Sequence, residues 1–238
     1  MEEAEIRKHP LIVELVGRSG VGKSFLYNKL KNELNNEDQY LFTDYTGYKY
    51  IFLFNLRLFF DSVLTINCCS LKKGYFLKYL KRWYWTQLLI KNKRNNQGKS
   101  FVIIDEGPFQ ILRSIKRFGK GSLNKVRSCV FKHSKYLPDV VILVGADWDV
   151  IYKRKLIKKH DRGKDTYLTV SNGKRKDIGL QMTKEDISHA CKFKKINIIE
   201  INNADDNLDF NVKTIIDQLN KIRSNAEDVN RQLTRGQQ

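Results

Sequence analysis

The stretch that decides the fold is residues 17–24, GRSGVGKS, which lies between a short apolar run and a segment with helical spacing. It matches the pattern G-x-x-x-x-G-K-[ST] at every defined position. The run Leu11–Val16 before it has the length and composition of a buried strand. From Lys23 onward, one side of a predicted helix carries the apolar residues Phe25, Leu26, Leu30 and Leu34. A strand, a glycine-rich turn and a helix in this order predict a phosphate-binding loop.

Each part of this motif has a chemical role. Glycines let successive backbone N–H groups turn inward and surround phosphate oxygens without a Cβ in the way. The helix that follows points the positive end of its dipole at the same anion. In this pattern the lysine neutralises the β- and γ-phosphates and the last hydroxyl ligates Mg²⁺. The sequence therefore predicts a site for Mg²⁺ and ATP or GTP, made of Gly17, Arg18, Ser19, Gly20, Val21, Gly22, Lys23 and Ser24.

A second apolar run ends in two carboxylates. Residues Val102–Ile104 are followed directly by Asp105 and Glu106. Ligands bind outside the carboxyl ends of the strands in open parallel sheets, so both acids are expected at the site. Asp105 is predicted to hold the Mg²⁺ shell through water, and Glu106 to orient a hydroxyl or a water. An ordinary strand that ends in an acidic turn is the alternative interpretation.

The composition fits one large domain in a reducing compartment. The 238 residues include four cysteines without paired spacing, and nothing resembles a signal peptide, so we expect a cytoplasmic protein. The most apolar run, Tyr50–Phe60, is interrupted by Asn55 and Arg57, whereas a membrane span needs about 20 apolar residues. We therefore expect a buried helix there and no membrane partner. A formal charge of +18 favours phosphate-bearing partners, nucleic acid among them. A solvated, lysine-rich surface explains the same charge.

Short apolar runs alternate with helical segments along the chain. This alternation is typical of an α/β fold in which a parallel sheet is covered on both faces. We expect a three-layer sandwich with about five strands and helical insertions that serve an acceptor and a lid. The strands are predicted at Leu11–Val16, Tyr40–Thr43, Phe101–Ile104, Val140–Val144 and Ile196–Ile201.

Together these features resemble the P-loop nucleoside and nucleotide kinases, which are thymidylate-kinase-like in the broad sense. Besides the phosphate loop, the resemblance rests on residues 105–108 (DEGP), 140–154 and 198–203. It implies a kinase-like domain over residues 1–223, with a helical insertion at about 48–98 and a lid at about 149–180. Residues 224–238 are expected to form a flexible polar tail after a last helix at Val212–Ile222.

The resemblance also assigns roles at the phosphate end of the site. A basic lid in such kinases closes over the phosphates, and here it implies that Arg154 and Arg162 contact the transferring group. Positioned cations stabilise charge on the equatorial oxygens, which supports that assignment. Adenine stacks near the loop after the last strand in the family, which places Asn203 at the nucleotide. A solvated face explains either arginine alone.

The identity of the general base stays open between Asp44 and Glu106. Asp44 follows the predicted second strand, where many hydroxyl-phosphorylating kinases have an acid that accepts a proton. It precedes Thr46-Gly47, so a turn aspartate is an equal interpretation. Arg113 is a candidate for holding the acceptor, and an ordinary surface arginine fits as well. The acid pair at Asp105 departs from the Asp-Arg that is frequent there in the family.

Residues 75–90 alternate aromatic and basic side chains on a predicted helix. Phe76, Leu80, Trp83 and Gln87 share one face, and Lys78, Lys81 and Arg82 gather on another. Core packing explains the aromatic face better than ligand binding does. The corresponding insertion lines the acceptor site in the kinases, so Trp83, Trp85 or Gln87 is also a candidate for contacting an acceptor base or sugar.

Three classes of function fit these observations. The leading one is an enzyme, an ATP-dependent kinase that transfers a phosphoryl group to a small molecule. The second is a nucleotide-binding or nucleotide-hydrolysing protein that associates with nucleic acid, a 5′-polynucleotide kinase included. The third is a nucleotide-binding partner of another protein without catalysis. The sequence leaves open the acceptor, the choice of ATP or GTP, and the oligomeric state, a homodimer included.

Overall fold

A parallel sheet forms the centre of the protein. Its strands are β1 (Leu11–Gly17), β2 (Tyr40–Thr43), β3 (Phe101–Ile104), β4 (Val140–Gly145) and β5 (Asn197–Asn202). The computed structural model describes residues 9–34, 37, 39–43, 56–67, 71, 73–94, 100–118, 123–131, 134–160, 178–203 and 208–235. Within these residues the sheet has five strands in the order β2-β3-β1-β4-β5, and each neighbouring pair is parallel. The predicted α/β class is confirmed.

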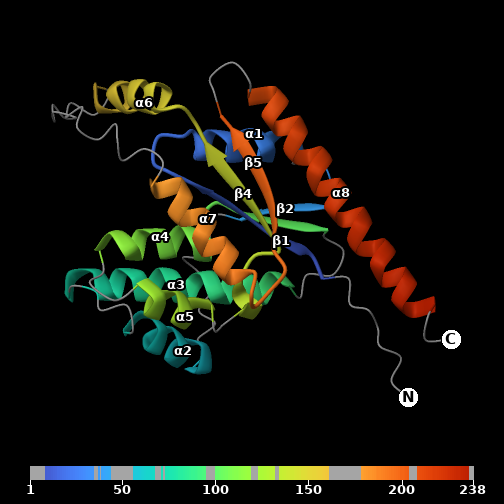
Figure 1. Cartoon of the computed structure of the whole chain (residues 1–238), viewed down its shortest axis with the longest axis horizontal. Helices are drawn as coiled ribbons and strands as arrows, with labels where there is room; N and C mark the ends of the chain where they lie inside the picture. Colours follow the sequence, from blue (N-terminus) through green and yellow to red (C-terminus); the bar gives the residue numbers. More distant parts are fainter. Residues whose placement is uncertain are drawn as a thin grey trace.

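Helices cover both faces of this sheet (Figure 1). Helices α1 (Lys23–Leu34) and α8 (Leu208–Arg235) lie on one face. On the other face lie α2 (Leu56–Asn67), α3 (Lys73–Arg94), α4 (Pro108–Phe118), α5 (Leu123–Phe131) and α7 (Ile178–Ala190). Helix α6 (Trp148–His160) follows β4 beyond its carboxyl end, and a 3₁₀ turn spans Ser134–Tyr136. The result is the expected three-layer sandwich.

The central strand β1 shows why the sheet is buried on both sides. Its side chains alternate between the two faces, as in any strand. Val13 and Leu15 pack in the core with α1 and α8, while Val16 packs in the core with α3 and α4. Glu14 is also fully buried, although it is charged in water. Its register partner is Ile104, the last residue of β3.

The register brings the ends of the strands to one edge. Gly17 pairs with Val144 on β4, and Gly145 pairs with Asn202 on β5. Glu14 pairs with Ile104 on β3, which in turn pairs with Thr43 on β2. Because all strands are parallel, the phosphate loop, the acids after β3 and the residue after β5 meet at this edge.

One helix boundary differs from the predictions. The last helix was expected to end at Ile222, and residues 224–235 are helical instead of a frayed tail. Apolar residues at 222, 226, 229 and 233 continue the helical spacing there.

Two smaller properties bear on the sequence predictions. In the described residues, none of the helices has the length and apolar character that crossing a membrane requires.

Cys129 and Cys191 are free thiols, the first partly buried and the second exposed. The cysteines at 68 and 69 lie outside the described residues.

Candidate active site

The phosphate loop has the backbone shape that its sequence predicts. Gly20 and Gly22 have φ angles of 95° and 84°, in the left-handed region that favours glycine. The Val21 N–H donates to the Arg18 carbonyl at 3.3 Å, which closes the turn. Helix α1 begins at Lys23, so its first N–H groups and the positive end of its dipole lie at the loop. This backbone suits an anion.

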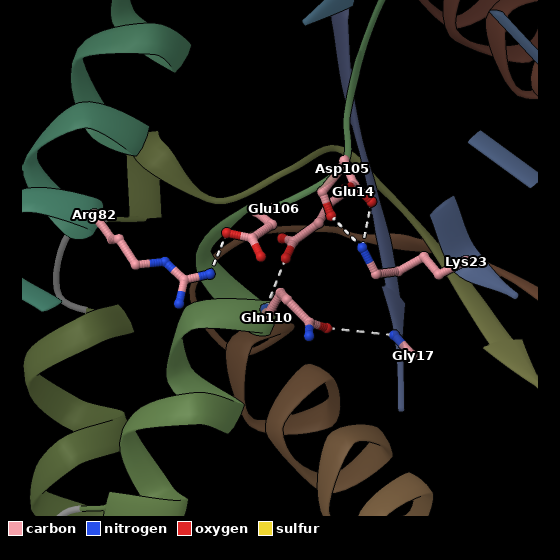
Figure 2. Close-up of polar contacts among 7 residues, drawn as sticks. All are labelled: Glu14, Gly17, Lys23, Arg82, Asp105, Glu106 and Gln110. Atoms are coloured by element: carbon pink, nitrogen blue, oxygen red, sulfur yellow. Dashed lines mark hydrogen bonds and ion pairs between the residues drawn. The ribbon is translucent and has the colours of Figure 1, made fainter. Parts of the chain in front are cut away.

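Lys23 lies against the acid at the end of β3. Its ammonium contacts the Asp105 carboxylate and donates to the Asp105 carbonyl oxygen at 2.9 Å (Figure 2). Both side chains keep some exposure, 12% for Lys23 and 26% for Asp105. A cation for phosphate oxygens and a carboxylate for a hard metal therefore meet at one point of the sheet edge.

The loop is also held from the side opposite Asp105. The Val21 carbonyl accepts a hydrogen bond from the Arg154 guanidinium at 3.0 Å and one from the Asn203 amide at 2.8 Å. Arg154 comes from α6 and Asn203 from the end of β5. A Cβ at Gly22 would collide with the Asn203 amide nitrogen and lie 3.0 Å from Arg154. The third glycine of the motif is thus required by these two side chains as well as by its φ angle.

Asn203 belongs to the support of the loop. Its side chain is 1% exposed, and its Oδ1 accepts from Asn211 of α8 at 3.4 Å. Asn211 also donates to the Asn202 carbonyl at 3.1 Å. The family resemblance implies a place for Asn203 at the nucleotide, and the structure shows that its amide donates to the Val21 carbonyl.

The second acid, Glu106, points away from Lys23 toward the helical insertion. Its carboxylate forms an ion pair with Arg82 of α3, as Figure 2 shows. The Glu106 side chain is 34% exposed. Asp105 and Glu106 are adjacent in the chain, yet one faces the phosphate loop and the other faces α3. The turn after β3 thus directs its two acids to different elements.

Glu14 is a functional candidate that the sequence analysis missed. Its carboxylate accepts hydrogen bonds from the backbone N–H of Gln110 at 2.8 Å and of Phe109 at 3.2 Å. Burial raises its pKa to about 8, against the lowering effects of these N–H groups and of the Lys23 charge. The signal was present, because a lone acid interrupts the apolar run of β1.

Gln110 links the same region to the phosphate loop. Its side-chain oxygen accepts from the Gly17 N–H at 3.4 Å, while its backbone N–H bonds to Glu14 (Figure 2). The first residue of the loop and the first turn of α4 are therefore joined through one side chain. No sequence pattern pointed to this glutamine.

The aromatic face of α3 is core, as the sequence favoured, but it contains unpaired polar groups. Trp83 and Gln87 are fully buried. Ser62 Oγ lies 2.8 Å from both the Leu58 carbonyl and Gln87 Oε1. Within the part of the chain that the structure describes, Trp83 Nε1, Thr86 Oγ1 and Gln87 Nε2 have no hydrogen-bond partner.

Turning the Gln87 amide does not remove this deficit. A hydroxyl has one proton, so Ser62 can donate to the Leu58 carbonyl while Gln87 Nε2 donates to Ser62. Gln87 Oε1 is then the atom left over. One polar end of this amide therefore lacks a partner among the described residues in either orientation.

Two predicted site residues cannot be placed. Asp44 and Arg162 lie outside the described residues, as does most of the proposed lid. Ser24 is exposed in the first turn of α1. Thus the structure brings together the loop, Lys23, Asp105, Arg154 and Asn203, and it places Glu106 beside them, paired with Arg82 of α3.

Comparison with known proteins shows likeness in structure only. No known family model matches the chain, and no curated protein matches its sequence. The YorR protein from Bacillus subtilis, solved in complex with phosphorylated GDP, has 19% identity and a TM-score of 0.49, over 88% of this chain and 95% of that one. The deoxyadenosine kinase from M. mycoides, solved with the products dCMP and a flexible dCDP, has 15% identity and a TM-score of 0.48, over 89% and 100%.

The chain's own parallel sheet, glycine-rich loop and first helix define an α/β fold with a P-loop.

Proposed function

We propose that this protein is a phosphotransferase that uses a Mg-nucleotide, ATP or GTP, to phosphorylate a small molecule of the nucleoside or nucleotide type. One observation carries the proposal. The phosphate-loop lysine contacts Asp105, and the adjacent Glu106 is turned toward α3 by Arg82. A carboxylate in this place can accept the proton of an acceptor hydroxyl or orient an attacking water, so turnover that depends on an acceptor separates a kinase from a hydrolase.

The donor end assigns one role to each group. The loop N–H groups and the ammonium of Lys23 bind the β- and γ-phosphates. Arg154 already lies at the loop through the Val21 carbonyl, and it stabilises charge on the transferring group. Arg162 of the proposed lid has the same role. Asn203 holds the loop beside the nucleotide.

The available oxygen ligands fit Mg²⁺. A serine hydroxyl and one carboxylate, from Ser24 and Asp105, are hard donors, and Mg²⁺ is usually held by one or two carboxylates together with substrate phosphates. No group of three or more His, Cys, Asp and Glu side chains suited to a metal occurs among the residues described. The ion would neutralise phosphate charge and orient the donor when bound.

At the acceptor end, Glu106 is the group we assign as general base. The hydroxyl of the acceptor attacks the γ-phosphorus and its proton passes to the Glu106 carboxylate, while the bond to the bridging oxygen of the leaving diphosphate breaks. Arg82 orients this carboxylate. Asp44 is the competing base, and the two are separated by comparing Glu106→Gln with Asp44→Asn.

The buried polar groups of α3 support a heterocyclic acceptor. Unpaired buried polar atoms are rare in folded proteins and require an explanation. Trp83 Nε1 and the amide of Gln87 are such atoms, and they lie on the helix that carries Arg82. Both side chains are fully buried, so a nucleobase would pair with these atoms only after a movement of α3 that opens a cavity beside them.

The test is an acceptor screen. Labelled ATP and GTP are incubated with nucleosides, nucleoside monophosphates, sugars and 5′-hydroxyl oligonucleotides, with Lys23→Ala as the blank. The proposal expects label on one class of acceptor and none in the blank. Transfer that survives in Lys23→Ala contradicts the assignment of the site. Nucleotide binding without transfer to any acceptor instead supports a non-catalytic partner protein.

A nucleic acid end is the second candidate acceptor. Lys78 and Lys81 are exposed on α3 near Arg82, and the formal charge of the chain is +18. Such binding releases counterions, so oligonucleotide affinity should fall steeply as salt rises. A kinase for small molecules predicts no such salt dependence for its acceptor.

A further inference from the structure

The first turn of α4 lacks a capping side chain of its own. The first N–H groups of a helix have no partner within it, and a Ser, Thr, Asp or Asn at the N-cap usually accepts from them. Here the residue before the helix is Gly107, which has no side chain, and the first helical residue is Pro108, which has no N–H. The open donors are therefore Phe109 and Gln110.

Glu14 supplies the missing cap from another element. One carboxylate oxygen accepts from Gln110 at 2.8 Å and the other from Phe109 at 3.2 Å. The absence of a side chain at Gly107 is part of the same arrangement, because a Cβ there would collide with the Glu14 carboxyl group. Helix α4 is thus attached to the middle of β1.

This attachment connects α4 to two parts of the candidate active site, the acids after β3 and the phosphate loop. Asp105 and Glu106 directly precede Gly107, so the cap fixes the end of the turn that carries both acids. The backbone N–H of Gln110 donates to Glu14, and the side-chain oxygen of Gln110 accepts from the Gly17 N–H at the start of the phosphate loop. Glu14 itself is on β1, three residues before that glycine. The loop and the acids therefore share one support.

We propose that Glu14 is a positioning residue for phosphoryl transfer, which caps α4 from β1 and so fixes Asp105 and Glu106 relative to Lys23. This inference rests on the proposed function for its kinetic part. Its structural part, the cap, can be measured without any activity. A buried acid used only to fill the core would lack this effect on the two acids.

Amide hydrogen exchange tests the cap itself. The comparison is made at about pH 9, above the Glu14 pKa of about 8, where both carboxylate oxygens of wild type accept hydrogen bonds. In Glu14→Gln the side chain keeps its size, but its NH₂ group faces one of the two N–H donors, so the bidentate cap is lost. We expect the protection of Phe109 and Gln110 to fall roughly tenfold or more, because an N-cap is lost. Val13→Ala is the control, since Val13 packs on the opposite face of β1 and should leave both amides protected. Equal protection in wild type and Glu14→Gln overturns the proposal.

A rescue variant distinguishes positioning from general damage. Glu14→Ala removes the cap and also the atoms that exclude a side chain at Gly107. Adding Gly107→Ser then supplies a local N-cap whose hydroxyl accepts from Phe109 or Gln110. We expect the double variant to regain most of the protection that Glu14→Ala loses. If protection stays low in a folded double variant, the capping role is wrong.

The kinetic readout connects the cap to the site. At temperatures that give equal folded fractions, Glu14→Gln should lose kcat roughly tenfold, with a change of less than about threefold in the KM for the nucleotide, because misplaced catalytic groups act on the transition state. Val13→Ala should keep kcat. Equal losses in both variants contradict the positioning role. If wild type transfers no phosphate at all, the proposed function fails, and the exchange data still decide the cap.

Discussion

The ammonium of Lys23 lies against the carboxylate of Asp105, and the two residues are 82 positions apart in the chain. The contact joins the start of α1 to the end of β3 at the carboxyl edge of the sheet. In the complex with a Mg-nucleotide we expect Lys23 to turn to phosphate oxygens, and Asp105 to face the metal. The contact thus holds the two groups close to where they act.

Gly22→Ala should abolish nucleotide binding. The new Cβ would meet the Asn203 amide nitrogen and the Arg154 guanidinium at a φ of 84°, a strain of about 1–3 kcal/mol before any clash. Calorimetric titration with Mg-ATP and Mg-GTP measures the loss. Gly145→Ala is a matched control on β4, because its Cβ would meet only the Ile201 carbonyl oxygen at 3.7 Å. Normal binding by Gly22→Ala would contradict the described loop.

Arg154 and Asn203 should act together on the phosphate loop. Both donate to the Val21 carbonyl, so removing one leaves the other in place. We expect Asn203→Ala and Arg154→Ala each to weaken nucleotide affinity by about 1 kcal/mol, because the remaining donor still holds the carbonyl, and the double variant to lose more than the sum. Titration of the four proteins gives the coupling energy. Strictly additive losses would show that the two side chains do not share this carbonyl.

The ion pair between Arg82 and Glu106 should matter more to the acceptor than to the nucleotide. Arg82→Met leaves Glu106 without its partner from α3, so we expect kcat to fall about tenfold, with nucleotide affinity nearly unchanged. Lys81→Met changes an exposed neighbouring cation and should leave transfer to a small acceptor intact. If Lys81→Met instead impairs only oligonucleotide acceptors, the nucleic acid alternative gains support.

Glu14 predicts a dependence of stability on pH. Its folded pKa of about 8 lies above the ordinary value of 4.5, so between these values the unfolded chain loses a proton that the folded protein keeps. The free energy of unfolding should therefore fall as pH rises through this window, by up to about 1.4 kcal/mol per unit, and level off above it.

Urea denaturation of wild type and Glu14→Gln at several pH values measures this effect. The variant lacks the titrating group, so its free energy of unfolding should not show this fall. The free energy of unfolding of the variant minus that of wild type should therefore increase as pH rises from 5.5 to about 8. The Lys23 ammonium faces Glu14 and lowers its pKa, and therefore a Lys23→Ala background should extend the window upward. Curves that stay parallel for wild type and Glu14→Gln would show that Glu14 does not titrate in this range.

The strands and the phosphate loop could be predicted because their signals are local. Four or more apolar residues before a turn define each of the strands β1, β3 and β4, and the loop motif fixes its own backbone through glycines. That Asp105 lies at the same edge of the sheet as Lys23 followed from the rule that ligands bind outside the carboxyl ends of parallel strands. This much of the site needs no knowledge of side-chain packing.

The remaining contacts depend on tertiary packing. The ion pair between Arg82 and Glu106 could not be predicted from their spacing in the sequence. The position of α3 relative to the end of β3 depends on how the core side chains between them pack. Glu14 was read as part of an apolar run, although a lone acid in such a run indicates a buried polar contact. The continuation of α8 was missed because its apolar residues are widely spaced among polar ones.

Titration of Mg-ATP and Mg-GTP into the wild-type protein and Lys23→Ala tests the central claim most directly. Wild type should bind at least one of them with measurable heat. Lys23→Ala should bind about 100-fold more weakly or not at all, since hydrogen bonds to charged groups contribute about 1.5–3 kcal/mol each and every 1.4 kcal/mol is a factor of ten in affinity. Lys29→Ala, on the same helix and paired with Asp209 at 2.8 Å, should bind like wild type. No uptake of either nucleotide by folded wild type, or equal uptake by Lys23→Ala, would contradict the account.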